Sequence, residues 1–217
     1  MVNPDIRQYV EAEILPRYVH FDAAHRLDHV QAVIQNSLNM ATHYNVNTDM
    51  VYVIAAYHDT GLAEGRERHH IVSGDIIRAD KQLKPWFDKI QIGIMADAAE
   101  DHRASSKHEP RTIYGKIVAE ADRCIEPISI IRRTIQFGLS HYPELDKEGN
   151  YQRTVEHMQE KYAEGGYLKL WIPESPNRQR LDELRKIFRD KEQFYKIFSR
   201  LYDEEKQQIF YQNETHN

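Results

Sequence analysis

Histidine and aspartate side chains recur between His29 and Asp122, at places where predicted helices begin or end. The central pair is His58-Asp59, which follows the apolar run VYVIAAY and could offer an imidazole nitrogen and a carboxylate oxygen to one cation. Mixed nitrogen and oxygen ligands suit Fe, Mn, Co, Ni or Zn, whereas a structural zinc site usually contains cysteine thiolates. The candidate metal ligands are His29, His58, Asp59, His70, His102 and Asp122.

These six ligands are too many for one catalytic metal that keeps an open position for water. Two metals that share Asp59 as a bridge would use all of the ligands and still leave room for water. The sequence therefore predicts a centre that holds two divalent cations.

Two of the ligands have neighbouring histidines that could take their place. His70 is preferred to His69 because of its spacing from the following Ser73-Gly74. His102 is preferred to His108, which lies in the same predicted loop.

Each candidate also has a simpler explanation, as a solvated histidine or as a carboxylate that caps a helix. The flanks of Asp122 argue against this explanation, because Val118, Ala119 and Ala121 predict a buried face. An unpaired carboxylate would be costly in such a place. We therefore expect Asp122 to lie beside a cation.

Apolar residues recur at helical spacing along nearly the whole chain, without the alternation that is typical of strands. The expected fold class is all-α. Each candidate ligand falls near a helix end, so a helical bundle could direct all of them inward. In the first part of the chain, helices are predicted over residues 4–19, with Pro16 kinking or ending the helix, and over 28–44, 49–58, 69–83, 86–100 and 113–125.

The pattern of residue types along the sequence changes beyond Pro127. The last segment, 178–211, predicts one long amphipathic helix without metal-binding residue types on its apolar stripe, as expected of core or of a dimer seam. We predict a single all-α domain over 1–217, with a core over about 20–127 and a C-terminal helical extension over about 128–217. Within this extension, the segments before 178–211 are a helix ending at His141, a turn over 143–150, a polar stretch over 153–166 and an apolar piece over 168–176.

The composition excludes several classes of protein. At 217 residues, with 41% hydrophobic and 29% charged residues, the chain fits one helical domain with well-solvated outer faces. Its apolar runs are too short to span a bilayer, and its first residues lack a signal pattern. The single cysteine, Cys124, fits a reducing compartment, so we expect a cytoplasmic protein with no membrane partner. The net charge of −5 argues against a nucleic-acid-binding surface.

The order His29, His58-Asp59, Asp122 resembles that of the HD superfamily of metal-dependent phosphohydrolases. The local sequences are also similar: AAHRLDHV resembles the helix of the first histidine, AAYHDTG the signature, HHIVSG the helix that follows, and IYGKIVAEADR the helix of the last aspartate. The additional His70 and His102 resemble those of the HD proteins with dinuclear centres. The resemblance covers about residues 20–127.

This resemblance implies an HD-domain helical bundle that hydrolyses a phosphate ester or anhydride, with a nucleotide as the favoured substrate. Asp59 would bridge the metals and help activate water. Metal-activated water would attack phosphorus while cationic side chains stabilise the added charge. In this hypothesis His29, His58 and Asp122 bind one metal, His70 and His102 bind the other, and the candidate phosphate-binding residues are His25, Arg103 and Lys116.

Two alternatives remain from the sequence. Some HD proteins with the same order of ligands resemble diiron oxygenases that use O₂, and identical side chains can serve either chemistry. A third possibility is a module that retains the metal and senses a nucleotide without turning it over. The expected partner is a small phosphorylated molecule, with a homodimer as a further option.

Overall fold

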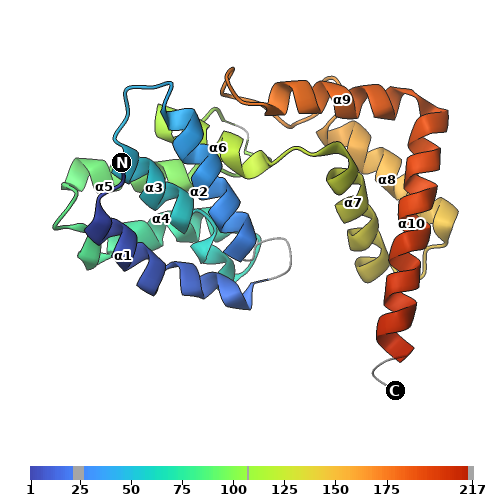
Figure 1. The fold of residues 1–217 in the computed structure, drawn as a ribbon, viewed down its shortest axis with the longest axis horizontal. Coiled ribbons are helices and arrows are strands. Elements are labelled where there is room, and N and C mark those ends of the chain that lie inside the picture. The colour runs from blue at the N-terminus through green and yellow to red at the C-terminus, as the bar shows by residue number, and fades with distance from the viewer. Residues whose placement is uncertain (22–26, 107, 215–217) are drawn as a thin grey trace. The chain divides into compact units, whose positions relative to one another are not determined.

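The protein is described by a computed structural model that covers residues 1–21, 27–106 and 108–214, with side chains up to residue 209. Every regular element in this part of the chain is a helix, which confirms the predicted all-α class (Figure 1). None of these helices is long and apolar enough to cross a membrane. The chain divides into two compact units: unit 1 is Met1–Cys124 with Lys169–Ser175, and unit 2 is Ile125–Leu168 with Pro176–Asn217. The single domain predicted from the sequence stays a prediction.

Unit 1 is built around one apolar helix, α3 (Thr48–Tyr57), whose residues from Met50 to Tyr57 are all buried. Asn47 starts this helix, since its side chain accepts hydrogen bonds from the backbone of Asp49 and Met50. A helix that is apolar on all sides must be surrounded by other elements. Its neighbours are α1 (Pro4–Glu13), α2 (Leu27–Ala41), α5 (Lys89–Glu100) and α6 (Ile113–Arg123).

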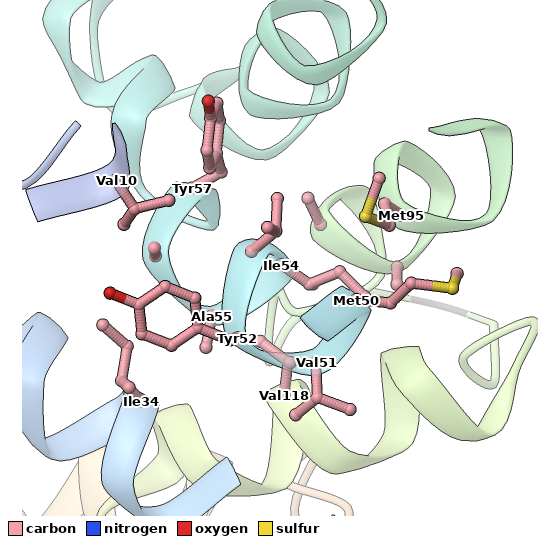
Figure 2. Packing of buried hydrophobic residues seen from close by; sticks show 14 of the residues in the cluster. Val10, Ile34, Met50, Val51, Tyr52, Ile54, Ala55, Tyr57, Met95 and Val118 are labelled. Carbon is pink, nitrogen blue, oxygen red and sulfur yellow. The ribbon is translucent and has the colours of Figure 1, made fainter. Parts of the chain in front are cut away.

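Figure 2 shows how the neighbouring helices cover α3. Val10 of α1, Ile34 of α2, Met95 of α5 and Val118 of α6 belong to the same buried cluster as the side chains of α3. This packing fixes the C-terminal end of α3, where His58 and Asp59 follow. The remaining elements of unit 1 are the 3-10 helices η1 (Leu15–His20), η2 (Thr60–Glu64) and η3 (Lys81–Leu83), together with α4 (His69–Ala79).

Polar side chains shift one end of two predicted helices, and a third predicted helix divides in two. The helix predicted over 69–83 stops at Ala79, because Asp80 is extended and its side chain accepts from the backbone of Gln82. The helix predicted from Trp86 starts at Lys89, after a capping box between Asp88 and Gln91. The helix predicted over 4–19 divides into α1 and η1, near the predicted break at Pro16.

A segment from the C-terminal half of the sequence, Lys169–Ser175, packs into unit 1. The buried carboxylate of Glu120 on α6 accepts hydrogen bonds from the backbone of Trp171, at 2.7 Å, and of Ile172, at 3.4 Å. Ile172 belongs to the hydrophobic core of this unit. Unit 1 therefore includes a short segment of the region predicted to be the C-terminal extension.

Unit 2 contains four helices, α7 (Pro127–His141), α8 (Lys147–Lys161), α9 (Asn177–Arg189) and α10 (Lys191–Glu214), within the described residues. Arg132 of α7 forms ion pairs with Glu204 and Glu205 of α10. Buried side chains on these helices include Ile131, Ile135, Met158, Leu184, Phe194 and Phe198.

Two sequence predictions for unit 2 are wrong. The single helix predicted over 178–211 is broken at Asp190, whose extended backbone ends α9 and whose side chain accepts from Gln193 at the start of α10. The turn predicted over 143–150 is shorter, because Asp146 caps α8 by accepting from the backbone of Gly149. In both places an aspartate side chain satisfies the free N–H groups of a helix start.

Candidate metal centre

The imidazole rings of three histidines in unit 1 are fixed by the same kind of backbone contact. In each, Nδ1 lies within hydrogen-bond distance of the backbone carbonyl three residues earlier: His58 with Ala55 at 2.8 Å, His69 with Arg66 at 2.8 Å, and His102 with Ala99 at 2.5 Å. A carbonyl can only accept, so Nδ1 must donate, and Nε2 of a neutral ring then carries the lone pair. Metal-binding histidines are commonly fixed in this way, by a hydrogen bond from the other ring nitrogen.

The first ligand group consists of His29, His58, Asp59 and Asp122. The His58 Nε2 lies 3.2 Å from Asp59 Oδ2 and 3.6 Å from Asp122 Oδ1. The His29 Nε2 lies 3.2 Å from Asp122 Oδ1 and 3.8 Å from Asp59 Oδ2. These four ligand atoms, from α2, the end of α3 and α6, lie within 4.8 Å of one another, as ligands of one ion would.

The second ligand group consists of Asp59, His69 and His102. The Nε2 atoms of His69 and His102 face each other at 3.1 Å. Asp59 Oδ1 lies 3.5 Å from His69 Nε2 and 3.3 Å from His102 Nε2. Asp59 therefore belongs to both groups, with Oδ2 toward the first and Oδ1 toward the second.

The first ligand group holds its carboxylates ionised. Burial acts to raise the pKa of Asp59, but His58 and His102 outweigh it and lower the pKa well below its usual value. Burial likewise acts to raise the pKa of Asp122, but His29 and His58 outweigh it and lower the pKa well below its usual value. Burial acts to lower the pKa of His58, but the charge of Asp59 and the interactions with Asp122 raise it well above its usual value. In the metal-free protein, His58 of the first ligand group therefore tends to be protonated.

The second ligand group has the opposite tendency. Burial and the nearby His102 lower the pKa of His69. Its ring therefore tends to be neutral, with the lone pair of Nε2 available. A cation could accept this lone pair, and the Nε2 of His102 lies 3.1 Å away as a second nitrogen ligand.

The structure brings together five of the six predicted ligands and places His69 where the sequence analysis preferred His70. The geometry therefore favours His69 over His70, and the ligand role of His70 stays a prediction. Successive residues of a helix point about 100° apart, so adjacent histidines at the start of α4 cannot face the same ion. His70 instead lies with Nδ1 3.4 Å from Nη1 of Arg103, and burial and Arg103 lower its pKa to about 4. His108, the rejected alternative to His102, is exposed.

The predicted phosphate-binding residues have different surroundings. Arg103 donates to the backbone carbonyl of Glu67 and, at 3.0 Å, to Ser105 Oγ, so its guanidinium is held beside the loop that leads into α4. Lys116 forms an ion pair with Glu109, which is exposed. His25 lies outside the described residues.

The end of α3 explains how His58 and Asp59 are oriented. The last carbonyl groups of a helix have no partner within it. Here side chains supply the partners: His58 Nδ1 for Ala55, the Tyr18 hydroxyl for Ala56 at 2.9 Å, and Thr60 Oγ1 for Tyr57 at 2.7 Å. Tyr18 was not among the predicted site residues, because no local sequence pattern links it to the His58-Asp59 dipeptide.

Gly61 also helps to build the second ligand group. A Cβ at this position would lie 2.1 Å from the backbone oxygen of His69 and 2.7 Å from the backbone nitrogen of Ser73. Only glycine lets the chain after Asp59 approach the start of α4 this closely. The glycine directly after the HDT sequence was a usable signal that the sequence analysis did not develop.

The residues of both groups fit divalent cations. His58 Nε2 is fully buried and, among the residues that the structure describes, makes no hydrogen bond. Such an atom is costly unless a ligand satisfies it. Imidazole nitrogens and carboxylate oxygens are the ligands of catalytic zinc, iron, manganese and cobalt sites.

A known protein family covers the part of the chain that holds both ligand groups. The family model described as the HD domain matches residues 26–125, a range that contains both ligand groups. The chain is also similar to a predicted HD superfamily hydrolase from an uncultured Thermotogales bacterium, known from a crystal structure, at 20% identity over 70% of this chain and 84% of that one, with a TM-score of 0.49. Among curated proteins, none matches this chain. Residues 26–125 therefore form an HD domain.

Proposed function

We propose that this protein hydrolyses a phosphate ester or anhydride of a small molecule, using two divalent cations that share Asp59. The observation that carries the proposal is the division of the Asp59 carboxylate, with one oxygen toward each ligand group. Cations bound there would lower the pKa of a water molecule and polarise a phosphoryl oxygen.

The side chains of the chain itself have separate tasks in this proposal. His29, His58 and Asp122 hold the first cation, and His69 and His102 hold the second. The backbone carbonyls that fix three of these rings keep their Nε2 atoms aimed at the cations without rearrangement. Such preorganisation is what a hydrolytic site requires, because the ligands need not reorient during the reaction.

Arg103 is the proposed phosphate-binding side chain. Its positive charge helps to lower the pKa of both His69 and His70, so it lies close to the second ligand group. Arginine can donate two parallel hydrogen bonds to a phosphate. Lys116 is less suited to this task, because its ammonium group is paired with Glu109. We further propose that the substrate phosphate belongs to a nucleotide.

The test is phosphate release from a panel of nucleoside mono-, di- and triphosphates and simple phosphomonoesters, with Mn²⁺, Co²⁺, Fe²⁺, Ni²⁺ or Zn²⁺ added to metal-depleted protein. We expect metal-dependent release from at least one nucleotide, and its loss in His58→Ala. The matched control is His108→Ala, since His108 is an exposed histidine outside both ligand groups.

Two results would replace this proposal with its alternatives. Consumption of O₂ by the iron-loaded protein, without phosphate release from any compound, would indicate an oxygenase. Tight nucleotide binding by the metal-loaded protein without any turnover would indicate a sensing module.

A further inference from the structure

Tyr18 contacts the backbone next to His58 and at Asp59 but comes from a different part of the chain. It belongs to η1, before the residues that match the HD domain. Its side chain is fully buried, and the ring of Phe21 packs edge-on against it with 5.2 Å between the ring centroids. Burial and this contact hold the hydroxyl in one place.

The Tyr18 hydroxyl forms hydrogen bonds with the backbone on both sides of His58. It donates to the carbonyl of Ala56 at 2.9 Å and accepts from the backbone N–H of Asp59 at 3.3 Å. One oxygen atom therefore connects the last turn of α3 to the residue that both ligand groups share.

The Tyr18 hydroxyl is the side-chain acceptor of the Asp59 backbone N–H just beyond the end of α3. In a continuing α-helix the N–H of Asp59 would donate to the carbonyl of Ala55. That carbonyl instead accepts from Nδ1 of His58. His58 is the last residue with helical dihedrals, the backbone at Asp59 leaves the helix with φ −109° and ψ 4°, and the Asp59 N–H donates to the Tyr18 hydroxyl. The Ala55 carbonyl thus fixes the His58 ring, and the Tyr18 hydroxyl holds the backbone of the adjacent Asp59.

We propose that Tyr18 is a positioning residue for the metal centre: its hydroxyl fixes the backbone of Asp59 so that one carboxylate oxygen faces each ligand group. This inference rests on the proposed function, in that it takes both groups to bind cations. It adds a residue outside the HD domain to the parts that the centre requires. Removing an outer partner of a metal ligand commonly weakens metal binding about 10- to 100-fold.

The test compares Tyr18→Phe with Tyr57→Phe in the full chain. Tyr57 is a matched control, because it is also fully buried and its hydroxyl donates a hydrogen bond of 2.6 Å to Asp80, away from Asp59. Both substitutions remove one oxygen atom and keep the ring. Mn²⁺ is titrated into each metal-depleted variant at a temperature well below its melting temperature, with circular dichroism as the check on folding.

We expect the Tyr18→Phe variant to bind Mn²⁺ about 10-fold or more weakly than the wild type, and Tyr57→Phe to bind it within about 2-fold. A second readout is the rise in melting temperature that Mn²⁺ produces, since this rise reports binding to the folded state. The rise should shrink in Tyr18→Phe and persist in Tyr57→Phe, even if both metal-free variants melt earlier than the wild type.

Equal Mn²⁺ affinity in the wild type and Tyr18→Phe, with only the metal-free melting temperature lowered, would overturn this inference and leave the proposed function intact. Equal weakening in both variants would also overturn it, because the effect would then follow the loss of any buried hydroxyl. A wild-type chain that binds no metal at all would overturn the proposed function and this inference together.

Discussion

The two ligand groups differ in charge although they share Asp59. The first group contains two carboxylates, Asp59 and Asp122, and the second contains only Asp59. A site with more negative charge attracts a divalent cation more strongly. The comparison therefore indicates a tight first site and a weaker second site whose occupancy depends on Asp59.

The same difference shows in the histidines. The pKa of His58 in the first group is raised, whereas the pKa of His69 in the second group is lowered. In the metal-free protein a proton can partly balance the first group. The lowered pKa of His69 leaves the lone pair of its Nε2 available, so a cation bound by His69 and His102 would hold these two imidazoles together.

The largest effect should come from the shared carboxylate. Asp59→Asn removes the negative charge from both ligand groups, and we expect loss of both cations and a fall in hydrolysis of more than about 100-fold. Asp122→Asn changes only the first group and should leave the second cation measurable. Metal analysis after dialysis checks both variants. Retention of two cations by Asp59→Asn would show that the groups do not depend on a shared ligand.

The adjacent histidines of α4 provide the next test. His69→Ala should reduce the bound metal from two ions per chain to one and lower activity about 10- to 100-fold, because it removes a nitrogen from the second group. His70→Ala is the matched control and should keep both ions. The reverse outcome, with His70 required and His69 dispensable, would restore the ligand that the sequence favoured.

Gly61→Ala should damage the second group through the backbone. The new Cβ would overlap the backbone oxygen of His69, so α4 must move away from Asp59, at a cost of about 1–3 kcal/mol in unfolding free energy. Gly93→Ala is a suitable control, since a Cβ there meets nothing within 4 Å and should stabilise α5 by about 0.5–1 kcal/mol. Urea unfolding and metal titration measure both effects. Unchanged stability in Gly61→Ala would contradict the described approach of α4.

The smallest predicted effect is a pH dependence of the metal-free protein. A histidine whose folded pKa is raised stabilises the fold fully below its unfolded pKa of 6.5, and this stability is lost as the pH rises through the folded pKa. Because the pKa of His58 is raised, unfolding free energy should fall above pH 6.5, by up to about 1.4 kcal/mol per pH unit. Urea unfolding in the presence of a chelator measures this.

Other histidines act in a separate window. The pKa values of His70 and His157 are lowered to about 4, so these residues make stability rise between pH 4 and 6.5 and change little above it. Asp122→Asn removes one cause of the raised pKa of His58 and should flatten the decline above pH 6.5. A metal-free wild type whose stability rises over that range would contradict the assignment of the proton to the first group.

The sequence predicted the parts of the centre that depend on residue type and helix ends. His58 and Asp59 follow an apolar helix, and Asp122 has apolar flanks, so their burial and approach could be anticipated. The choice between His69 and His70 could not, because it depends on the residue at which α4 begins and on which ring reaches the carbonyl of Arg66. Spacing along the sequence does not determine that rotation.

Long-range contacts limited the prediction in a similar way. Tyr18 reaches Asp59, and Trp171 reaches Glu120, across separations that no local pattern records. The break at Asp190 was missed for another reason, since the apolar spacing continues through it while the aspartate side chain caps the next helix. Periodicity predicted which faces are buried better than it predicted where a helix stops.

The most direct test of the account is the number of cations bound by the metal-depleted wild-type chain. Titration with Mn²⁺, followed by metal analysis after gel filtration, should give two ions per chain, bound with different affinities as the unequal charges of the two groups require. A single ion or none at saturating Mn²⁺ would contradict the central claim that Asp59 joins two metal sites.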